Sequence, residues 1–432
     1  MKPMIRKDLA EQLAPKIIDM ARARSMHAGE PLREEAFAIF SEQGFPTQKN
    51  EDWKYTNVAP IARESFVVRT GPDASVEVAA AGKYPESARS RIVFLDGAFD
   101  KNLSTYPAIS FADALRDEKF AGILKKHLGA GADVAKNGFV ALNTAFIGDG
   151  VFIHIPKDTK AETPIHFLFV STDGKASFPR VLIYAERGSQ ATIIESYESH
   201  SEGCSFTDSV VEIVLEDDAN LTHYRVQKEN SESFNIGTTT ATIARGSVYD
   251  ATNINLGGAI SRHDANVKFT AEGGECFVDG LYMLNGSQHA DTHSVIDHTV
   301  PNCISHQTYK GVLSDRSHAV FNGKVFVREN ARGTDAQQSN KNLLLSNEAR
   351  VDTKPQLEIF NDDVKCAHGA TVGQLEEEEL FYLLTRGIGP DLAKNLLTYG
   401  FAEEVINKIK IESIKSELDE AVLHRLNANL EA

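Results

Sequence analysis

The feature that most constrains the fold is a long central body of short β-type segments. From Val151 to about Phe360, runs of β-branched and aromatic residues alternate with turns rich in Gly, Asp, Asn and Ser. Helical periodicity is nearly absent over these roughly two hundred residues. A β-rich chain of that length predicts a pair of sandwiches, a large barrel or a solenoid.

A longer repeat separates these alternatives. A turn with acidic, Gly or Ser residues precedes a β run and recurs at similar steps along the body, with one longer step from Glu275 to Ser317. A period in the twenties to thirties, with occasional insertions, is typical of a solenoid with two or three short strands per coil. The sequence therefore favours a β-helix whose helical termini cap its ends. The anchors of the repeat are Ser189, Ala219, Ser247, Glu275, Ser317 and Ala349.

The two ends of the chain differ from this body and divide it into three parts. Residues 1–150 are predicted to be a helical and mixed region, residues 151–365 the β-helix core, and residues 366–432 a C-terminal helical domain. The amphipathic C-terminal helices are expected to bury against the solenoid end or to present a groove to a partner. At the N-terminus, Pro31 predicts the first turn of a helix, and Trp53 is expected to dock this region onto the body. An earlier helix is predicted from the spacing of Leu9, Leu13, Ile17 and Met20.

Composition excludes several classes of function. The formal net charge is −16, so the chain does not fit a general nucleic-acid binder, and it offers no polybasic face to an anionic membrane. No apolar run approaches a membrane span, and the N-terminus lacks the apolar segment of a signal peptide. The widely spaced cysteines form no CxxC pair or disulfide framework, which predicts a reducing, cytoplasmic location. They are Cys204, Cys276, Cys303 and Cys366.

The stretch from Lys354 to Arg386 contains the most chemically capable pair of side chains. Its first third is expected to be a strand, and an acidic block that begins at Glu376 predicts the first turn of a helix. Cys366 and His368 lie between these segments, next to a glycine. We therefore expect a thiol and an imidazole at a strand-to-helix junction. Without further information, His368 could equally be a residue that hydrogen-bonds and caps that junction.

A second group of histidines lies within the β body. His289 and His293 are four residues apart, which in a strand separates their Cα atoms by ~13 Å, too far to share one ion. Polar stacking along the outside of the solenoid is therefore favoured over a metal site. The dipeptide Asn322-Gly323 predicts a turn between two strands of this span. The complete group is His289, His293, His298, Cys303, His306 and His318.

Three long motifs resemble the SufB/SufD family of iron–sulfur cluster assembly proteins. One is KPQLEIFNDDVKCAHGATVGQLEEEELFYLLTRGI, which begins at Lys354, and its HGATVGQL version is similar to the SufD branch of the family. The others are DHTVPNCISHQTYKGVL with the segments that follow it, and GFPTQKNEDWKYTNV near the N-terminus. The resemblance covers the β body and the C-terminal region almost continuously. It implies a right-handed parallel β-helix between helical ends.

The resemblance also implies a function, partners and site residues. It implies a non-enzymatic scaffold subunit of the SUF complex that pairs end to end with SufB and binds the ATPase SufC through its C-terminal helices. By motif position, His368 is the preferred ligand of iron or of a nascent cluster shared transiently with SufB, and Cys366 is the second candidate. No tightly bound cofactor is expected on the isolated chain, which could self-pair through its SufB-facing edge.

Two other classes of function are compatible with a β-helix alone. One is a carbohydrate-active enzyme, which requires clustered carboxylates with basic partners on one face of the solenoid. The pairs Asp217-Asp218 and Asp362-Asp363 lack an obvious basic partner nearby in the sequence. The other class is a purely structural homo-oligomer without a cofactor.

Overall fold

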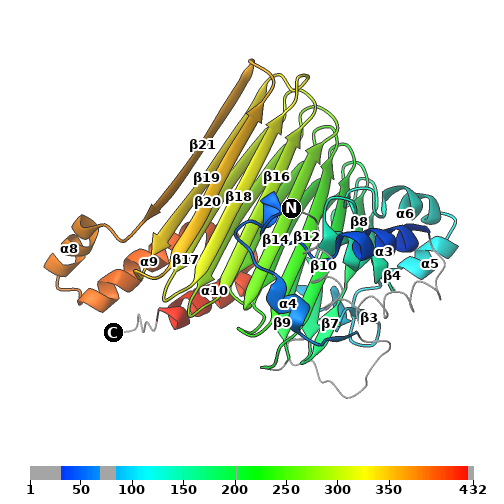
Figure 1. The fold of residues 1–432 in the computed structure, drawn as a ribbon. Helices are drawn as coiled ribbons and strands as arrows, with labels where there is room; N and C mark the ends of the chain where they lie inside the picture. Colours follow the sequence, from blue (N-terminus) through cyan, green and yellow to red (C-terminus); the bar gives the residue numbers. More distant parts are fainter. Residues whose placement is uncertain (1–30, 69–83, 149, 201, 427–432) are drawn as a thin grey trace, which may run out of the picture.

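The computed structural model describes residues 31–68, 84–148, 150–200 and 202–426 of the 432-residue chain. Its body is a parallel β-solenoid in which each coil contributes one strand to each of two sheets (Figure 1). The predicted β-helix with helical regions at both ends is therefore confirmed. The helix expected from Leu9 to Met20 lies outside the described residues.

The strands of the body fall alternately into the two sheets. The first sheet contains β1 (Val67–Val68), β4 (Ile109–Ser110), β5 (Val151–Ile155), β7 (Lys175–Ser177), β8 (Arg180–Ala185), β10 (Phe206–Leu215), β12 (Phe234–Ile243), β14 (Ile260–Phe269), β16 (His289–His298), β18 (His318–Val327) and β20 (Arg350–Ile359). The second sheet contains β2 (Arg91–Leu95), β3 (Ala98–Asp100), β6 (Ile165–Ser171), β9 (Gln190–Ser199), β11 (Asn220–Gln227), β13 (Val248–Asn255), β15 (Glu275–Leu284), β17 (Ile304–Leu313), β19 (Thr334–Leu344) and β21 (Val364–Gly373).

The turns between coils stack on one another and explain the sequence repeat. Gly188, Asp218 and Gly246 all adopt positive φ angles, of 69°, 60° and 60°. Their backbone N–H groups donate to carbonyl oxygens of the next coil's turn, at 2.9, 2.8 and 3.3 Å. A turn that must repeat this conformation in every coil selects Gly or Asp at the same position, because few other residues tolerate it.

The long step of the repeat, from Glu275 to Ser317, arises because the anchors move from strands of the second sheet to strands of the first. The insertion predicted at this step is therefore wrong. The anchors from Ser189 to Glu275 introduce strands of the second sheet, whereas Ser317 and Ala349 introduce β18 and β20 of the first sheet. Successive strands within one sheet start one coil apart, as do β15 at Glu275 and β17 at Ile304. The long step therefore spans about one and a half coils.

Short helices cover the outer face of the first sheet. Trp53 and Phe139 pack together there, with ring centroids 5.1 Å apart, and Trp53 also lies 3.7 Å from the guanidinium of Arg262 on β14. This contact confirms that Trp53 docks the N-terminal region onto the body, and Pro31 opens a helix as predicted. The helices before the solenoid are α3 (Pro31–Gln43), η1 (Glu51–Trp53), α4 (Ala59–Arg63), η3 (Pro85–Ser87), α5 (Phe111–Arg116), α6 (Ala121–His127) and α7 (Gly138–Ala145).

The C-terminal helices do not cover the end of the solenoid, contrary to expectation. After α8 (Glu377–Thr385), helices α9 (Pro390–Ile406) and α10 (Glu412–Arg425) fold back over the outer face of the second sheet (Figure 1). That face carries outward apolar side chains, so the helices bury their apolar side against it. These side chains include Ile194, Tyr224, Ile254, Leu281 and Val312.

Two boundaries of the three-part division can be compared with these elements. Residue 151 is the first residue of β5, but β2 and β4 from the region before it also join the sheets. Residue 365 lies inside β21. Among the described residues, no helix is long and apolar enough to cross a membrane.

Candidate functional site

The last coil leaves the solenoid open at one end. In the described part of the chain, β20 pairs only with β18, and β21 pairs only with β19. Apolar side chains are exposed along this edge, including Phe360 at 54% and Val372 at 47%. Unpaired strand edges with exposed apolar side chains are templates for another chain. This end of the molecule therefore has the properties of a pairing surface.

Cys366 and His368 both lie within β21, so the expected strand-to-helix junction at these residues is wrong. The strand continues to Gly373, and α8 begins only at Glu377. Cys366 pairs in register with Ala336, and His368 with Gln338. Both of these β19 partners are buried inside the solenoid. Cys366 and His368 therefore continue interior rows, but no further coil covers them.

This position brings the two predicted ligands together on one face. Side chains two residues apart on a strand point to the same side, with Cα atoms ~7 Å apart. Burial against the coil below raises the pKa of the Cys366 thiol, so the thiol is protonated at neutral pH. His368 is exposed. The geometry thus favours the imidazole over the thiol as a candidate metal ligand, because a thiol must lose its proton before it binds a metal.

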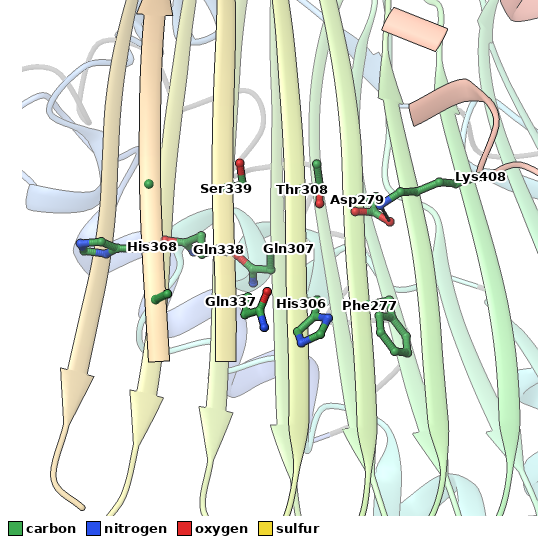
Figure 2. Close-up of a pocket in the computed structure, with 12 residues that line it drawn as sticks. Phe277, Asp279, His306, Gln307, Thr308, Gln337, Gln338, Ser339, His368 and Lys408 are labelled. Carbon is green, nitrogen blue, oxygen red and sulfur yellow. Dashed lines mark hydrogen bonds and ion pairs between the residues drawn. The ribbon is translucent and has the colours of Figure 1, made fainter. Parts of the chain in front are cut away.

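An open cavity of about 390 Å³ lies beside this edge, over the outer face of the second sheet. Figure 2 shows Lys408 reaching Asp279 across it, and the Nζ–Oδ2 distance is 2.8 Å. Burial raises the pKa of Asp279, while Lys408 acts in the opposite direction. His306 lines the same cavity, 3.5 Å from the Asp335 carboxylate. These charges are already paired within the chain, so the cavity does not present a ready set of metal ligands.

His289 and His318 form a hydrogen-bonded row, as the interpretation of polar stacking along the outside of the body proposed. His289 and His318 are neighbours on β16 and β18, with their Nδ1 atoms 3.0 Å apart. His289 Nε2 lies 2.8 Å from Thr56 Oγ1, and His318 Nε2 lies 2.8 Å from Asp352. These rings lie on the outer face of the first sheet, partly beneath the N-terminal segment.

Three other members of the group lie apart from that row. His298 faces the solenoid interior, contrary to the predicted outside position, and its ring centroid lies 4.5 Å from that of Phe269. His306 is on the second sheet, and Cys303 donates weakly to backbone carbonyls in a turn. Across the described residues, no three His, Cys, Asp or Glu side chains form a group that could hold a metal ion.

Sequence reasoning missed the residues that surround His368. Gln338 and Gln307 precede it in the same interior row, one coil and two coils earlier in the sequence. The repeat could have revealed them, because residues one coil apart in the sequence are neighbours in space. Sequence reasoning also placed Asn322-Gly323 in a turn, but both residues lie within β18. The reason for a glycine at this position is its packing against Gln338.

The fold defines a parallel β-solenoid protein with one uncovered end. The family description "SUF system FeS cluster assembly, SufBD core domain" matches residues 167–401, and "SufBD protein N-terminal region" matches residues 11–167. The chain belongs to the SufBD family of the SUF iron–sulfur cluster assembly system.

Two relatives match over nearly their whole lengths. An iron–sulfur cluster assembly SufBD family protein of Synechocystis is 34% identical, over 90% of this chain and 89% of its own. The iron–sulfur cluster assembly protein SufD of Escherichia coli is 30% identical, over 89% of this chain and 90% of its own. A SufBD family protein of Mycobacterium leprae is 31% identical over 68% of this chain and 75% of its own.

Proposed function

We propose that this chain is a non-enzymatic scaffold subunit that pairs with SufB through its open solenoid end and presents His368 to iron or to a nascent cluster. The observation that carries this proposal is the place of His368 and Cys366 on β21. They project from interior rows that end at an uncovered edge. A partner coil stacked on this edge would enclose both side chains between the two proteins.

The donor set suits a site that must release what it builds. Imidazole and thiolate are common ligands of iron and of iron–sulfur clusters. One imidazole and one thiol from a single chain bind iron weakly, and the remaining ligands would have to come from SufB. Iron and the cluster are cargo in this scheme, shared between the subunits and transient. The isolated chain is then not expected to retain either of them.

The C-terminal region supports a second partner, the ATPase SufC. Helix α8 has no buried residue, and its Phe381 and Tyr382 are 68% and 58% exposed. Helices α9 and α10 are occupied by the second sheet, so we assign the docking of SufC chiefly to α8. Because α8 follows β21 directly, a motor bound to α8 could move the edge that carries His368.

The other candidate functions have less support. Asp218 forms a positive-φ turn, and Asp217 accepts a hydrogen bond from the Arg245 N–H in the stacked turns. This pair therefore has a structural role, and the carbohydrate-active enzyme is not supported. All four cysteines are free, which fits our proposal that the assembly works in the reducing cytoplasm.

Replacement of His368 tests the proposal. In cells that depend on this SUF system, we expect His368→Ala to lower the activity of a cluster-dependent enzyme at least tenfold under iron limitation. His200→Ala is the matched control, because His200 is exposed in a loop far from β21, and it should retain full activity. Unchanged activity of the His368→Ala variant, with normal amounts of protein, would remove His368 from the site.

A further inference from the structure

A row of polar side chains inside the solenoid ends at His368. Gln307 on β17, Gln338 on β19 and His368 on β21 are consecutive register partners. The same row is apolar in the two coils before Gln307, where it contains Ala251 and Val278. The two amides of this row therefore occupy the coils directly below the histidine. Figure 2 shows the three labelled residues on neighbouring strands.

The hydrogen bonds of this row have a direction. Gln338 Nε2 donates to Gln307 Oε1 at 2.7 Å, and Ser294 Oγ donates to the same oxygen at 3.2 Å. Both glutamines are almost fully buried. The amide nitrogen of Gln338 is thus turned toward β17. Since oxygen and nitrogen leave the amide carbon in different directions, the oxygen is turned away from β17, and β21 is the next strand on that side.

The oxygen of Gln338 has no donor. Gln338 Oε1 is buried and has no hydrogen-bond partner among the described residues. Buried polar atoms without a partner are uncommon and often mark a functional site. His368 is the register neighbour of Gln338 on the β21 side. An N–H of its imidazole is the kind of donor that this oxygen lacks.

The fold makes room for Gln338 in this position. Gly323 on β18 faces the interior, and a Cβ there would lie 2.2 Å from Gln338 Nε2 and 2.9 Å from the Phe321 ring. Any larger residue at position 323 would displace the amide. The glycine within β18 thus has a specific role, although glycine weakens a strand.

We propose that Gln338 is a positioning residue for His368. Gln338 Oε1 accepts a hydrogen bond from the Nδ1–H of the imidazole. The lone pair of Nε2 then faces the open end of the solenoid. In Figure 2 the ring of His368 extends from β21 away from Gln338, so this bond requires the ring to turn toward the amide. A carbonyl that accepts the second N–H of a metal-binding histidine fixes its tautomer and strengthens it as a ligand. The role as an iron ligand rests on the proposed function.

The tautomer of His368 in the full chain tests this inference directly. Free imidazole side chains favour the Nε2–H tautomer in water, so a bond to Gln338 would reverse the usual preference. Nitrogen-15 labelling of histidine distinguishes the two forms by NMR, and a His368→Asn variant identifies the signals. We expect the Nδ1–H form to predominate in the neutral ring of His368. Predominance of the Nε2–H form in the unmodified chain would overturn the inference.

Three variants separate positioning from a structural role. Gln338→Leu should return His368 to the Nε2–H form, whereas Gln338→Glu, which keeps an acceptor, should preserve the Nδ1–H form. Gln337→Leu is the matched control, because Gln337 is the adjacent, exposed residue of the same strand, and it should change nothing. A Gln338→Leu variant that folds and keeps the Nδ1–H form would contradict the inference. If that variant does not fold, the unmodified chain alone decides.

The affinity for Fe²⁺ tests whether the tautomer of His368 matters for metal binding. It also keeps a failure of the positioning role distinct from a failure of the proposed function. In the complex with SufB, kept free of oxygen, we expect Gln338→Leu to weaken Fe²⁺ binding by about tenfold, as for other residues that orient a metal ligand. If His368→Ala leaves cluster assembly unchanged while the Nδ1–H form is present, the proposed function fails and the positioning role stands. If His368→Ala abolishes assembly but Gln338→Leu alters neither tautomer nor affinity, the positioning role fails.

Discussion

A few buried charged residues hold the N-terminal segment onto the solenoid. The guanidinium of Arg262 contacts Asp264 and Asp291 at 2.8 Å each, and the indole of Trp53 covers it. Arg262 also donates to the backbone carbonyl of Asp52 at 2.6 Å. A fully buried cation is tolerated only when its donors are satisfied. The single tryptophan of the chain thus closes an ion-pair network as well as filling apolar space.

At the residue scale, buried histidines make stability depend on pH. Burial lowers the pKa of His298 to about 4, below the value of about 6.5 expected in the unfolded chain. Between these values the unfolded state binds more protons, so stability falls as the pH drops from about 6.5 toward 4. The contribution of this ring approaches ~3 kcal/mol at the acid end. Denaturant unfolding as a function of pH measures it.

A variant isolates the contribution of His298 from other groups. His298→Gln removes the titrating ring but keeps a side chain that can bond to Ser305, which now lies 2.8 Å from Nε2. We expect its stability to change less between pH 6.5 and 4 than that of the unmodified chain. The ring of His289, whose pKa burial also lowers to about 4, leaves a residual slope. Equal slopes for both proteins would show that His298 does not cause the acid sensitivity.

At the element scale, the coils of the solenoid could be predicted from the sequence, but its last strand, β21, could not. The turn glycines and aspartates revealed the repeat because the positive φ angle recurs in every coil. The segment from Val364 to Gly373 gave no such signal. Its interior positions hold Cys366, His368, Ala370 and Val372, and no coil lies above them to demand large apolar residues. A strand at an open end lacks the burial that makes a strand recognisable in a sequence.

The place of α9 and α10 was missed for a related reason. Strands of the second sheet carry apolar residues on both faces, as Leu281 and Tyr282 on β15 illustrate, and both are buried. Such a strand is buried on both sides and needs a covering layer outside the solenoid. The outward apolar residues of these strands therefore predict helices on this face. The signal was missed because only the inward-facing residues of each strand were considered.

Helix α8 is the element whose change should separate the two proposed partners. We expect Phe381→Glu to reduce co-purification of SufC at least tenfold while SufB remains bound, because a large apolar residue at the centre of an interface carries much of its energy. The thermal midpoint should stay the same, since α8 has no buried residue. Glu420→Lys on α10 is the control, as Glu420 is also exposed. Equal loss of SufB and SufC would contradict separate docking sites.

At the scale of the whole molecule, the two ends of the solenoid are unequal. At the N-terminal end, β3 pairs antiparallel with β2, and β4 pairs antiparallel with β5, so the first coil is covered by the chain itself. At the other end β20 and β21 remain uncovered (Figure 1). A solenoid with one finished end and one open end can extend in only one direction. This asymmetry favours a pair of chains over a fibre.

A charge at the open end should therefore prevent pairing without unfolding the coil. Val372 faces the interior side of β21 and is 47% exposed, so a lysine there reaches solvent in the isolated chain but would be buried by a partner coil. Burial of an unpaired charge at an interface costs several kcal/mol, roughly 2–5. We expect Val372→Lys to weaken binding to SufB at least tenfold in titration experiments. The self-association of the isolated chain, measured by light scattering, should weaken in parallel if it uses the same edge.

The first sheet provides a matched control for this experiment. Val67 on β1 is 53% exposed, but β1 pairs with β7 in the first part of the solenoid, far from β21. Val67→Lys adds the same charge to a strand of similar exposure and should leave binding to SufB unchanged. Normal pairing of the Val372→Lys variant would mean that the open end is not the interface, because no pairing that encloses His368 can avoid this neighbouring position on β21.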